Sequence, residues 1–126
     1  MRGLTLDAGA LIALERRSPV VSALLERSEA RGIPVRIPAP VLAQVWRGSS
    51  PRQARLARLV KIEETAVVVF DAETAKAAGQ LLAESGTSDV VDAAVVLCAR
   101  VHGDRVVTSD PGDLLRLDRQ LELVTL

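Results

Sequence analysis

The chain has 126 residues, which fits a single domain (1–126) that buries most of its apolar surface in one core. Its formal net charge is zero, so no whole-molecule field would draw it to nucleic acid or to an anionic membrane. The apolar fraction is 48% and the aromatic fraction only 2%, which favours helices packed on a parallel sheet over an aromatic-rich β-sandwich.

The first half of the chain alternates between strand and helix patterns. Pro19 stands where the first turn of a helix is expected, and Gly32 follows the last turn of the same helix. In chain order we expect a strand at 3–7, helices at 8–17 and 19–31, a strand within 33–40, and helices from about 40 to 48 and from 51 to 64.

The second half continues the alternation. The apolar run at 66–70 is bounded by polar residues and predicts a strand buried on both faces. We then expect helices at about 72–85 and 90–102, a strand at 104–109, one or two helical turns within 110–121, and a closing strand at 121–126. The connections are too short for antiparallel rearrangement, so we expect a three-layer α/β/α domain with a mainly parallel central sheet of four to five strands.

The arginine content and the single cysteine indicate which binding partners and which cellular compartment to expect. Arg supplies 14 of the 16 cations, which leaves room for local phosphate contacts, although surface salt bridges are the simpler explanation. The single Cys98 cannot form an internal disulfide, and no charged segment followed by an apolar one opens the chain, so we expect a reducing, cytoplasmic compartment. The longest apolar run, 93–99, is too short to span a bilayer, and we expect no membrane partner.

Carboxylates follow the ends of two expected strands. Asp7 ends the first strand and Asp110 follows the fourth. Ligands of open parallel sheets bind beyond the carboxyl ends of the strands, where helix N-termini also point. Asp92, on the expected inward face of its helix, can reach this edge, and Asp89 stands three residues earlier on nearly the same face. Helix capping is the alternative role for Asp89 and for Asp110.

The surroundings of these acids indicate a metal ion. Neither "LTLDAGA" nor "TSDVVDAA" contains a basic residue, so converging carboxylates would repel one another and raise one another's pKa unless a cation neutralised them. Ligation by Asp oxygens suits Mg²⁺ or Mn²⁺, whereas the lone His102 and the lone Cys98 give no zinc set. The chain has no GxxxxGK[ST], GxGxxG or GxSxG motif. Metal-assisted hydrolysis of a phosphodiester, and hence a nuclease, is the expected chemistry.

Four segments together resemble the PIN-domain ribonucleases and, within that family, the VapC toxins of bacterial toxin–antitoxin pairs. They are "LTLDAGALIAL", "IPAPVLAQVWRG", "SDVVDAAVVLCA" and "VVTSDPGDL", in that order and spacing. The resemblance implies a PIN-like fold and the toxin of a type II toxin–antitoxin system, a metal-dependent endoribonuclease that cuts RNA, expected to be tRNA, through metal-activated water. It also implies a homodimer, a cognate VapB-type antitoxin whose tail lies across the active site, and a toxin–antitoxin hetero-oligomer.

The resemblance assigns roles to particular acids. Asp7, Asp92 and Asp110 would bind the metal and act as catalytic residues, with Asp89 and Asp113 as auxiliary acids nearby.

One position departs from the family pattern. The family usually has a Glu on the helix after the second strand, and this chain has Gln44 there. An amide offers an oxygen but no charge, so we expect weaker ion binding or only one firmly held ion. The alternative is that Gln44 is simply a polar residue on a partly buried helix.

Other polar residues near these motifs have two interpretations each. Thr108 and Ser109 either bond carboxylates or a metal-bound water, or bond their own backbone. Arg47, Arg52 and Arg55 lie around the Gly48 turn and could follow an RNA backbone. Alternatively they are ordinary solvated residues, since Arg52, Arg55 and Arg58 are expected to share one exposed helix face.

Three further residues are interpreted structurally. We expect Cys98 and Trp46 to be packing residues and His102 to interact with the C-terminus of its helix. An exposed Trp46 would instead indicate a groove for a partner.

Two other functions stay open. The chain is alternatively a catalytically weak PIN-like binding module, with Gln44 as the lesion. A phospho-acceptor receiver domain also places acids and Mg²⁺ at this edge of a sheet, but it requires a Lys at the end of the last strand, and "LELVTL" supplies none.

Overall fold

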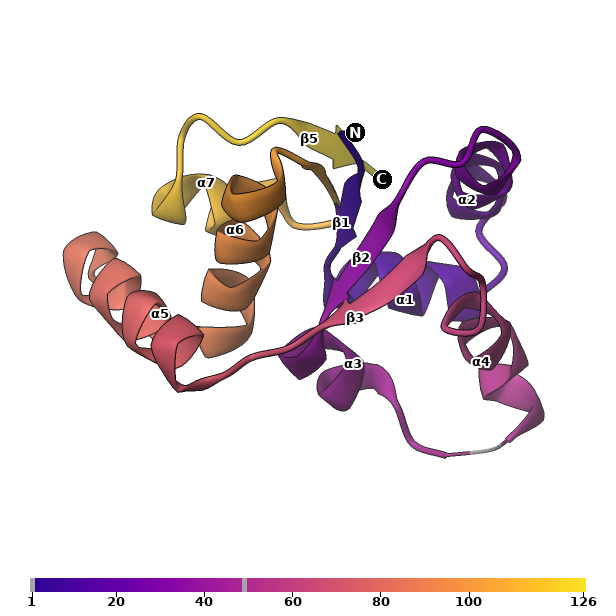
Figure 1. The fold of residues 1–126 in the computed structure, drawn as a ribbon, viewed down its shortest axis with the longest axis horizontal. Helices are drawn as coiled ribbons and strands as arrows, with labels where there is room; N and C mark the ends of the chain where they lie inside the picture. The colour runs from indigo at the N-terminus through magenta and orange to yellow at the C-terminus, as the bar shows by residue number, and fades with distance from the viewer. Residues whose placement is uncertain (1, 49) are drawn as a thin grey trace.

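The computed structural model describes residues 2–48 and 50–126. Within these residues, five strands form one sheet in the order β3-β2-β1-β4-β5, and every neighbouring pair is parallel (Figure 1). The strands are β1 (Leu4–Leu6), β2 (Val35–Pro38), β3 (Thr65–Val68), β4 (Arg105–Thr108) and β5 (Leu123–Thr125). The parallel sheet is confirmed, and β1 lies at its centre.

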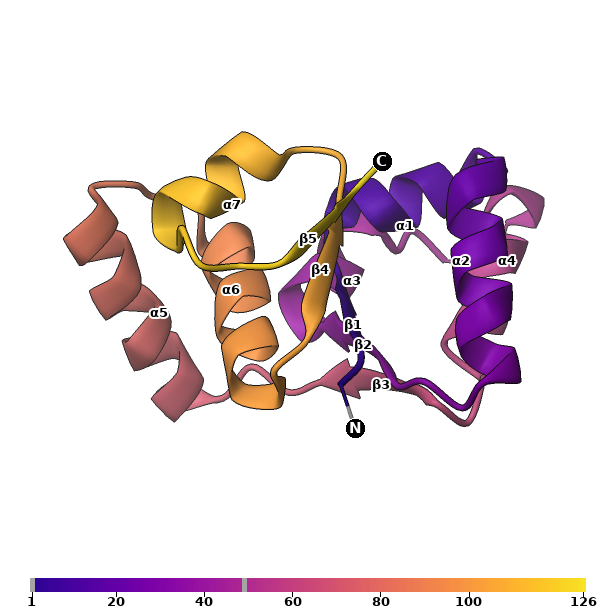
Figure 2. The same cartoon turned by 90° about the horizontal axis from the view of Figure 1, so that it is seen from above.

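Helices cover both faces of the sheet. They are α1 (Ala8–Glu15), α2 (Pro19–Ala30), α3 (Ala39–Val45), the short 3₁₀ helix η1 (Pro51–Gln53), α4 (Ala54–Leu59), α5 (Ala72–Ser85), α6 (Val90–His102) and α7 (Pro111–Leu117). Figures 1 and 2 show α5, α6 and α7 on one side and α1, α2 and α4 on the other, which confirms the three layers. In the described part of the chain, no helix combines the length and the hydropathy needed to cross a membrane.

The helix boundaries follow local chemistry. Ser18 caps α2 through a hydrogen bond from the Val21 N–H (3.5 Å), and Pro19 occupies its first turn. The helix expected at 51–64 is shorter and divided into η1 and α4, because the Gln53 side chain turns inward to bond the end of α3.

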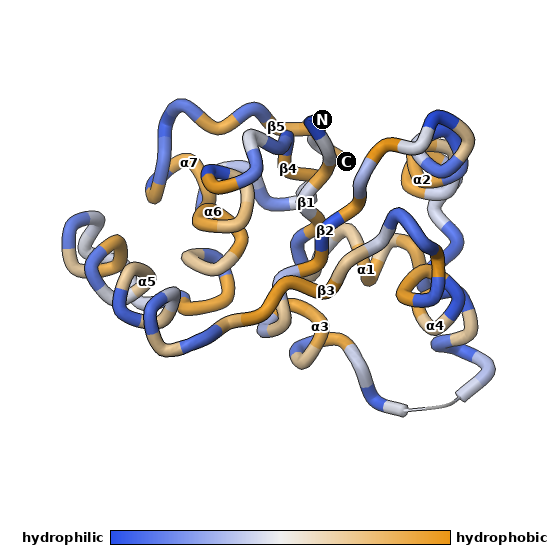
Figure 3. Tube along the Cα trace, in the orientation of Figure 1, coloured by the Kyte–Doolittle hydropathy of each residue, from blue (hydrophilic) through white to orange (hydrophobic). Residues whose placement is uncertain are grey.

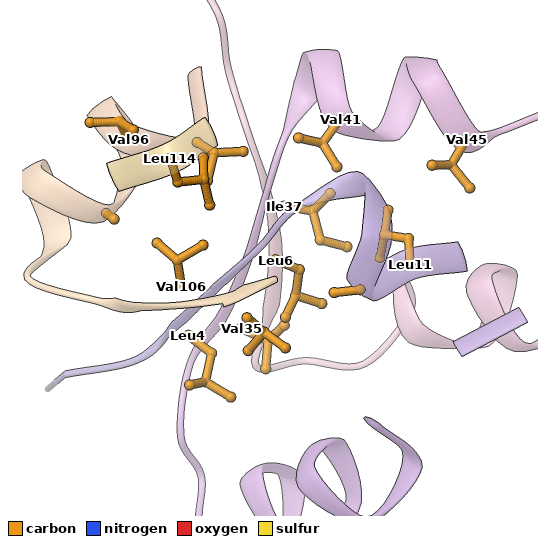
Figure 4. Packing of buried hydrophobic residues seen from close by; sticks show 14 of the residues in the cluster. Leu4, Leu6, Leu11, Val35, Ile37, Val41, Val45, Val96, Val106 and Leu114 are labelled. Atoms are coloured by element: carbon orange, nitrogen blue, oxygen red, sulfur yellow. The ribbon is translucent and has the colours of Figure 1, made fainter. Parts of the chain in front are cut away.

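Apolar side chains from the strands and from both helical layers form one core (Figure 4). Leu6, Ile37 and Val106 of the three central strands are fully buried, as are Leu11 of α1 and Val96 of α6. Figure 3 shows the same distribution along the chain, with hydrophobic residues concentrated where the strands meet the helices.

Strand β3 differs from its prediction. We expected residues 66–70 to be buried on both faces, but β3 is an edge strand that pairs only with β2. Val67 and Val69 are 40% and 74% exposed. The apolar run is therefore a poor guide to burial here, because the sequence does not reveal which strand lies at the edge of the sheet.

A buried ion pair fixes the amino edge of the sheet. The Asp104 side chain is fully buried, and its Oδ1 atom accepts hydrogen bonds from Arg36 Nη1 (2.5 Å) and from the Gly3 N–H (3.0 Å). The Thr5 hydroxyl donates to Oδ2 (2.9 Å). These bonds tie β1, β2 and the loop before β4 together, and the sequence analysis did not anticipate them.

Candidate active site

The carboxyl ends of β1 and β4 lie side by side. The two strands pair in parallel with Leu6 opposite Val107, and the Asp7 N–H donates to the Val107 carbonyl (3.2 Å). Figure 2 shows both strands ending at one edge of the sheet, where α1 and α7 begin. This geometry places Asp7 beside the Thr108–Asp110 segment, as the sequence predicts.

Asp7 is held in a buried position at the start of α1. Its side chain caps the helix by accepting a hydrogen bond from the Ala10 N–H (2.9 Å), and the residue is only 7% exposed. Burial raises the pKa of Asp7, and hydrogen bonds from Thr108, Ala10 and Gly9 oppose that rise. Thr108 also accepts a hydrogen bond from the Asp110 N–H (2.9 Å), so this side chain bonds both a carboxylate and its own backbone.

The α1 helix approaches the β4 end so closely that position 9 has no room for a side chain. A Cβ atom at Gly9 would overlap Ser109 Oγ and would lie 3.2 Å from Ser109 Cβ. Gly9→Ala is expected to cost about 1–2 kcal/mol in the free energy of unfolding. Urea denaturation of Gly9→Ala and Gly9→Ala/Ser109→Gly checks this. The second change should restore most of the loss, and no restoration would show that the clash lies elsewhere.

Among these acids, Asp92 has the largest rise in pKa. Burial, and then repulsion from Asp89, Asp113, Asp7 and Asp110, raises the pKa of Asp92 to about 6. Four other carboxylates therefore act on this one side chain, from α1, α6 and the β4–α7 segment. Asp92 therefore lies near enough to the other acids to be affected by their charges, and a shared metal site stays a prediction.

The remaining acids have distinct local roles. Asp89 Oδ1 accepts a hydrogen bond from the Asp92 N–H (3.0 Å), so Asp89 caps α6, as its alternative interpretation held. Asp110 precedes α7 but makes no side-chain capping bond. A hydrogen bond with Asp113 raises the pKa of the exposed Asp110 carboxyl, and the charge of Asp113 adds to the effect.

The acids lack protein cations as partners. Among the described residues, no Lys or Arg forms an ion pair with Asp7, Asp92 or Asp110, and Arg116 approaches only Asp113, at 3.8 Å. In the described part of the chain, no three of these acids have carboxylate oxygens that all lie within 4.8 Å of one another. Asp89, Asp92 and Asp113 border a hollow of about 320 Å³, which Arg116 also lines. A set of oxygen donors with unbalanced negative charge fits a hard divalent cation.

Gln44 lies in a different hollow. Its side chain is exposed on α3 and, together with Glu15, Arg47 and Arg52, lines a space of about 350 Å³. The structure therefore does not bring Gln44 into the hollow bordered by the acids.

The residues after α3 are organised by Gln53, which the sequence analysis missed. Gln53 is 4% exposed and accepts a hydrogen bond from the Arg47 N–H (2.7 Å). Its amide group donates to the Val45 carbonyl (2.8 Å) and to Glu15 (3.2 Å).

Trp46 is 38% exposed, so its interpretation as a packing residue is wrong. The bonds that draw Gln53 inward leave Trp46 at the surface of this turn.

The basic residues do not form one face. Arg47 Nη1 donates to the carbonyls of Ala43 (3.2 Å) and Trp46 (2.8 Å), and Arg52 lines the hollow that contains Gln44. Arg55 donates to Ser22 (3.4 Å) in a separate hollow between α2 and α4. Arg58 lines that second hollow together with Glu26 and Glu29. The expected common face of Arg52, Arg55 and Arg58 is therefore divided between two hollows.

Comparisons with known proteins agree on the fold. The chain resembles the VapBC2 structure from Rickettsia felis bound to a promoter DNA fragment, with a TM-score of 0.74, 17% identity and 98% of each chain covered. It resembles DNA-bound VapBC from Salmonella typhimurium with a TM-score of 0.71 and 19% identity, over 99% of this chain and 98% of that one. For FitAcB from Neisseria gonorrhoeae the TM-score is 0.64 and the identity 18%, over 97% of this chain and 96% of that one.

Sequence comparison identifies the family. No curated protein matches the chain. The family model described as the PIN domain matches residues 4–120, which is nearly the whole chain. Together with a five-stranded parallel sheet that carries acids at its carboxyl edge, this match shows that the chain belongs to the PIN domain family.

Proposed function

We propose that this PIN domain is a Mg²⁺- or Mn²⁺-dependent endoribonuclease and the toxin of a type II toxin–antitoxin pair. The observation that carries the proposal is the placement of Asp7 and the Thr108–Asp110 segment at neighbouring strand ends, together with Asp92, whose pKa is raised first by burial and then by the charges of four nearby carboxylates. Among the described residues Asp7, Asp92 and Asp110 have no Lys or Arg as an ion-pair partner, so a divalent ion is the partner that would balance their charge.

The proposed roles of the residues follow from their positions. Asp7, Asp92 and Asp110 would hold the ion, which supplies activated water and shields the phosphodiester when bound. The capping bond from Ala10 fixes the direction of the Asp7 carboxylate, and Thr108 supports it from β4. Asp89 fixes the start of α6 and therefore the position of Asp92. Asp113 adds negative charge beside Asp110.

The structural neighbours support a macromolecular partner. The Rickettsia felis and Salmonella typhimurium structures are VapBC pairs bound to DNA. We propose by analogy that a VapB-type antitoxin binds this chain, that the chain forms a homodimer and a hetero-oligomer with the antitoxin, and that it acts on tRNA in the cytoplasm. Arg47 and Arg52, which line one hollow, are the proposed contacts to the RNA backbone, and Arg55, in a separate hollow, is the more remote candidate.

A cleavage assay tests this proposal. The purified chain, incubated with total cellular RNA and Mg²⁺ or Mn²⁺, is expected to give discrete products that a chelator abolishes. Asp7→Asn should lower the rate at least about 100-fold, beyond the effect typical of groups that only orient ligands. Asp71→Asn is the matched control, because Asp71 caps α5 in the same way. Figure 2 shows that α5 begins beside the end of α6, away from the start of α1. Equal cleavage by Asp7→Asn would overturn the proposal.

The amide at Gln44, where the family usually has an acid, favours a second candidate, a catalytically weak binding module. Gln44 adds no charge and lines a hollow apart from the acids. If the missing charge at this residue limits ion binding, Gln44→Glu is expected to tighten Mn²⁺ binding about threefold to tenfold, because a negative charge on a neighbouring helix attracts the cation. Calorimetry against Gln80→Glu, the same change on the exposed face of α5, controls for net charge. An unchanged affinity would place position 44 outside the metal site.

A further inference from the structure

Three metal-ligating side chains gather at the edge of the sheet opposite the acids. Cys98 and His102 lie one turn apart near the end of α6, and Asp104 follows the helix. Among the described residues, this is the one group of three such side chains whose ligand atoms all lie within 4.8 Å of one another. Figure 2 shows the end of α6 and the start of β1 together at this edge. We expected from the sequence that Cys98 and His102 give no zinc set, because Asp104 was not recognised as a third ligand.

We propose that Cys98, His102 and Asp104 bind one thiophilic divalent cation of the Zn²⁺ class. Sulfur, imidazole nitrogen and carboxylate oxygen are the ligands of tetrahedral zinc, and the spacing of Cys98 and His102 on a helix is common among zinc ligands. Cys98 Sγ and His102 Nδ1 are 3.9 Å apart, close to the roughly 3.5 Å that separates two ligands around a tetrahedral zinc ion. His102 Nδ1 donates to the Cys98 carbonyl (2.9 Å), so a metal ion at Nδ1 would replace that hydrogen bond. The proposal concerns different residues from the acid site and is independent of the nuclease function.

The arrangement of Asp104 leaves one oxygen for a metal. Its Oδ1 atom is fixed by Arg36 and by the Gly3 N–H, which is the kind of support that orients metal-binding carboxylates. Its Oδ2 atom accepts only the Thr5 hydroxyl, and Thr5 Oγ1 also lies 3.4 Å from Cys98 Sγ. When a cation binds, Thr5 turns its hydroxyl away from Oδ2 and the Cys98 thiol releases its proton to solvent.

The residues around Cys98 and His102 leave space for a metal ion to enter, and the end of α6 favours positive charge there. A hollow of about 120 Å³ between β3, α5 and α6 is lined by Cys98 and His102, and leaves space for a water molecule as the fourth ligand. The ligands also lie at the C-terminal end of a 13-residue helix, where the dipole favours positive charge. Arg36 already pairs with Asp104, and its positive charge repels a metal ion at the same carboxylate. The affinity for the metal ion is therefore expected to be lower than that of a four-ligand structural zinc site.

Titration with Co²⁺ tests the site through a signal specific to sulfur ligation. The purified chain is expected to show a near-ultraviolet thiolate-to-cobalt charge-transfer band that saturates at one equivalent and that added Zn²⁺ abolishes. Cys98→Ser should remove the band, and His102→Ala should weaken Co²⁺ binding at least tenfold. Asp104→Asn is avoided because it would leave Arg36 with a neutral partner.

The acid site supplies the control. Asp7→Asn/Asp92→Asn should keep the band, which separates this proposal from the proposed nuclease site. Absence of the band from the folded wild-type chain, or equal Co²⁺ affinity in His102→Ala, would overturn the proposal. Circular dichroism of each variant verifies that it is folded. A band lost only in the acid-site variant would also contradict the assignment.

Discussion

Asp92→Asn is expected to stabilise the metal-free protein while removing its response to Mn²⁺. In the folded chain the pKa of Asp92 rises from 3.8 to about 6, so ionisation of this group is less favourable than in the unfolded chain. The resulting loss of stability is absent below about pH 4 and develops as the pH rises through about 6. After allowance for partial exposure, the variant should gain about 1–2 kcal/mol at neutral pH.

Urea denaturation at pH 4 and at pH 7.5 measures this effect. The wild-type and Asp92→Asn proteins should differ little at pH 4, and the variant should be more stable at pH 7.5. Saturating Mn²⁺ should stabilise the wild-type protein but not the variant, because ligand binding to the folded state adds to its stability. A variant that is less stable than wild type at pH 7.5 would show that Asp92 has a structural partner.

Arg36→Met is expected to cost about 3–5 kcal/mol in the free energy of unfolding. It leaves the fully buried Asp104 carboxylate without its cation, and an uncompensated buried charge is strongly destabilising. The matched control is Arg2→Met, because the Arg2–Glu122 pair is 2.7 Å long but exposed on both sides. That change should cost no more than about 1 kcal/mol.

The double variant Arg36→Met/Asp104→Asn isolates the charge effect. The Asn side chain keeps an oxygen acceptor for the Gly3 N–H but carries no charge, so the double variant should be more stable than Arg36→Met alone. A double variant as unstable as Arg36→Met would show that the loss comes from packing of the arginine stem.

Much of the fold could be predicted because local signals and topology agree. Pro19 and Gly32 marked real helix boundaries, and the alternation of strands and helices gave the parallel sheet. The edge position of β3 could not be predicted, since its composition resembles that of a central strand. The division of residues 51–64 also depended on a tertiary contact, the inward turn of Gln53 onto α3.

Some features of the candidate site could likewise be predicted from the sequence, and others could not. The placement of Asp7 beside the Thr108–Asp110 segment followed from strand ends in a parallel sheet, a rule that depends only on topology. The exposure of Trp46 depends on side-chain packing in a turn, for which the sequence has no periodic signal. Asp104 was missed because its partners are far away in the chain: it lies 68 residues from Arg36 and 101 from Gly3.

The most direct measurement is calorimetric titration of Mn²⁺ into the wild-type chain, Asp7→Asn/Asp92→Asn and Asp71→Asn. Saturable binding by wild type and by Asp71→Asn, lost in the double variant, is the predicted result. It would establish that the acids at the carboxyl edge of the sheet form a divalent-cation site. Equal Mn²⁺ binding by all three proteins would contradict the account, and would reduce these carboxylates to helix caps and surface acids.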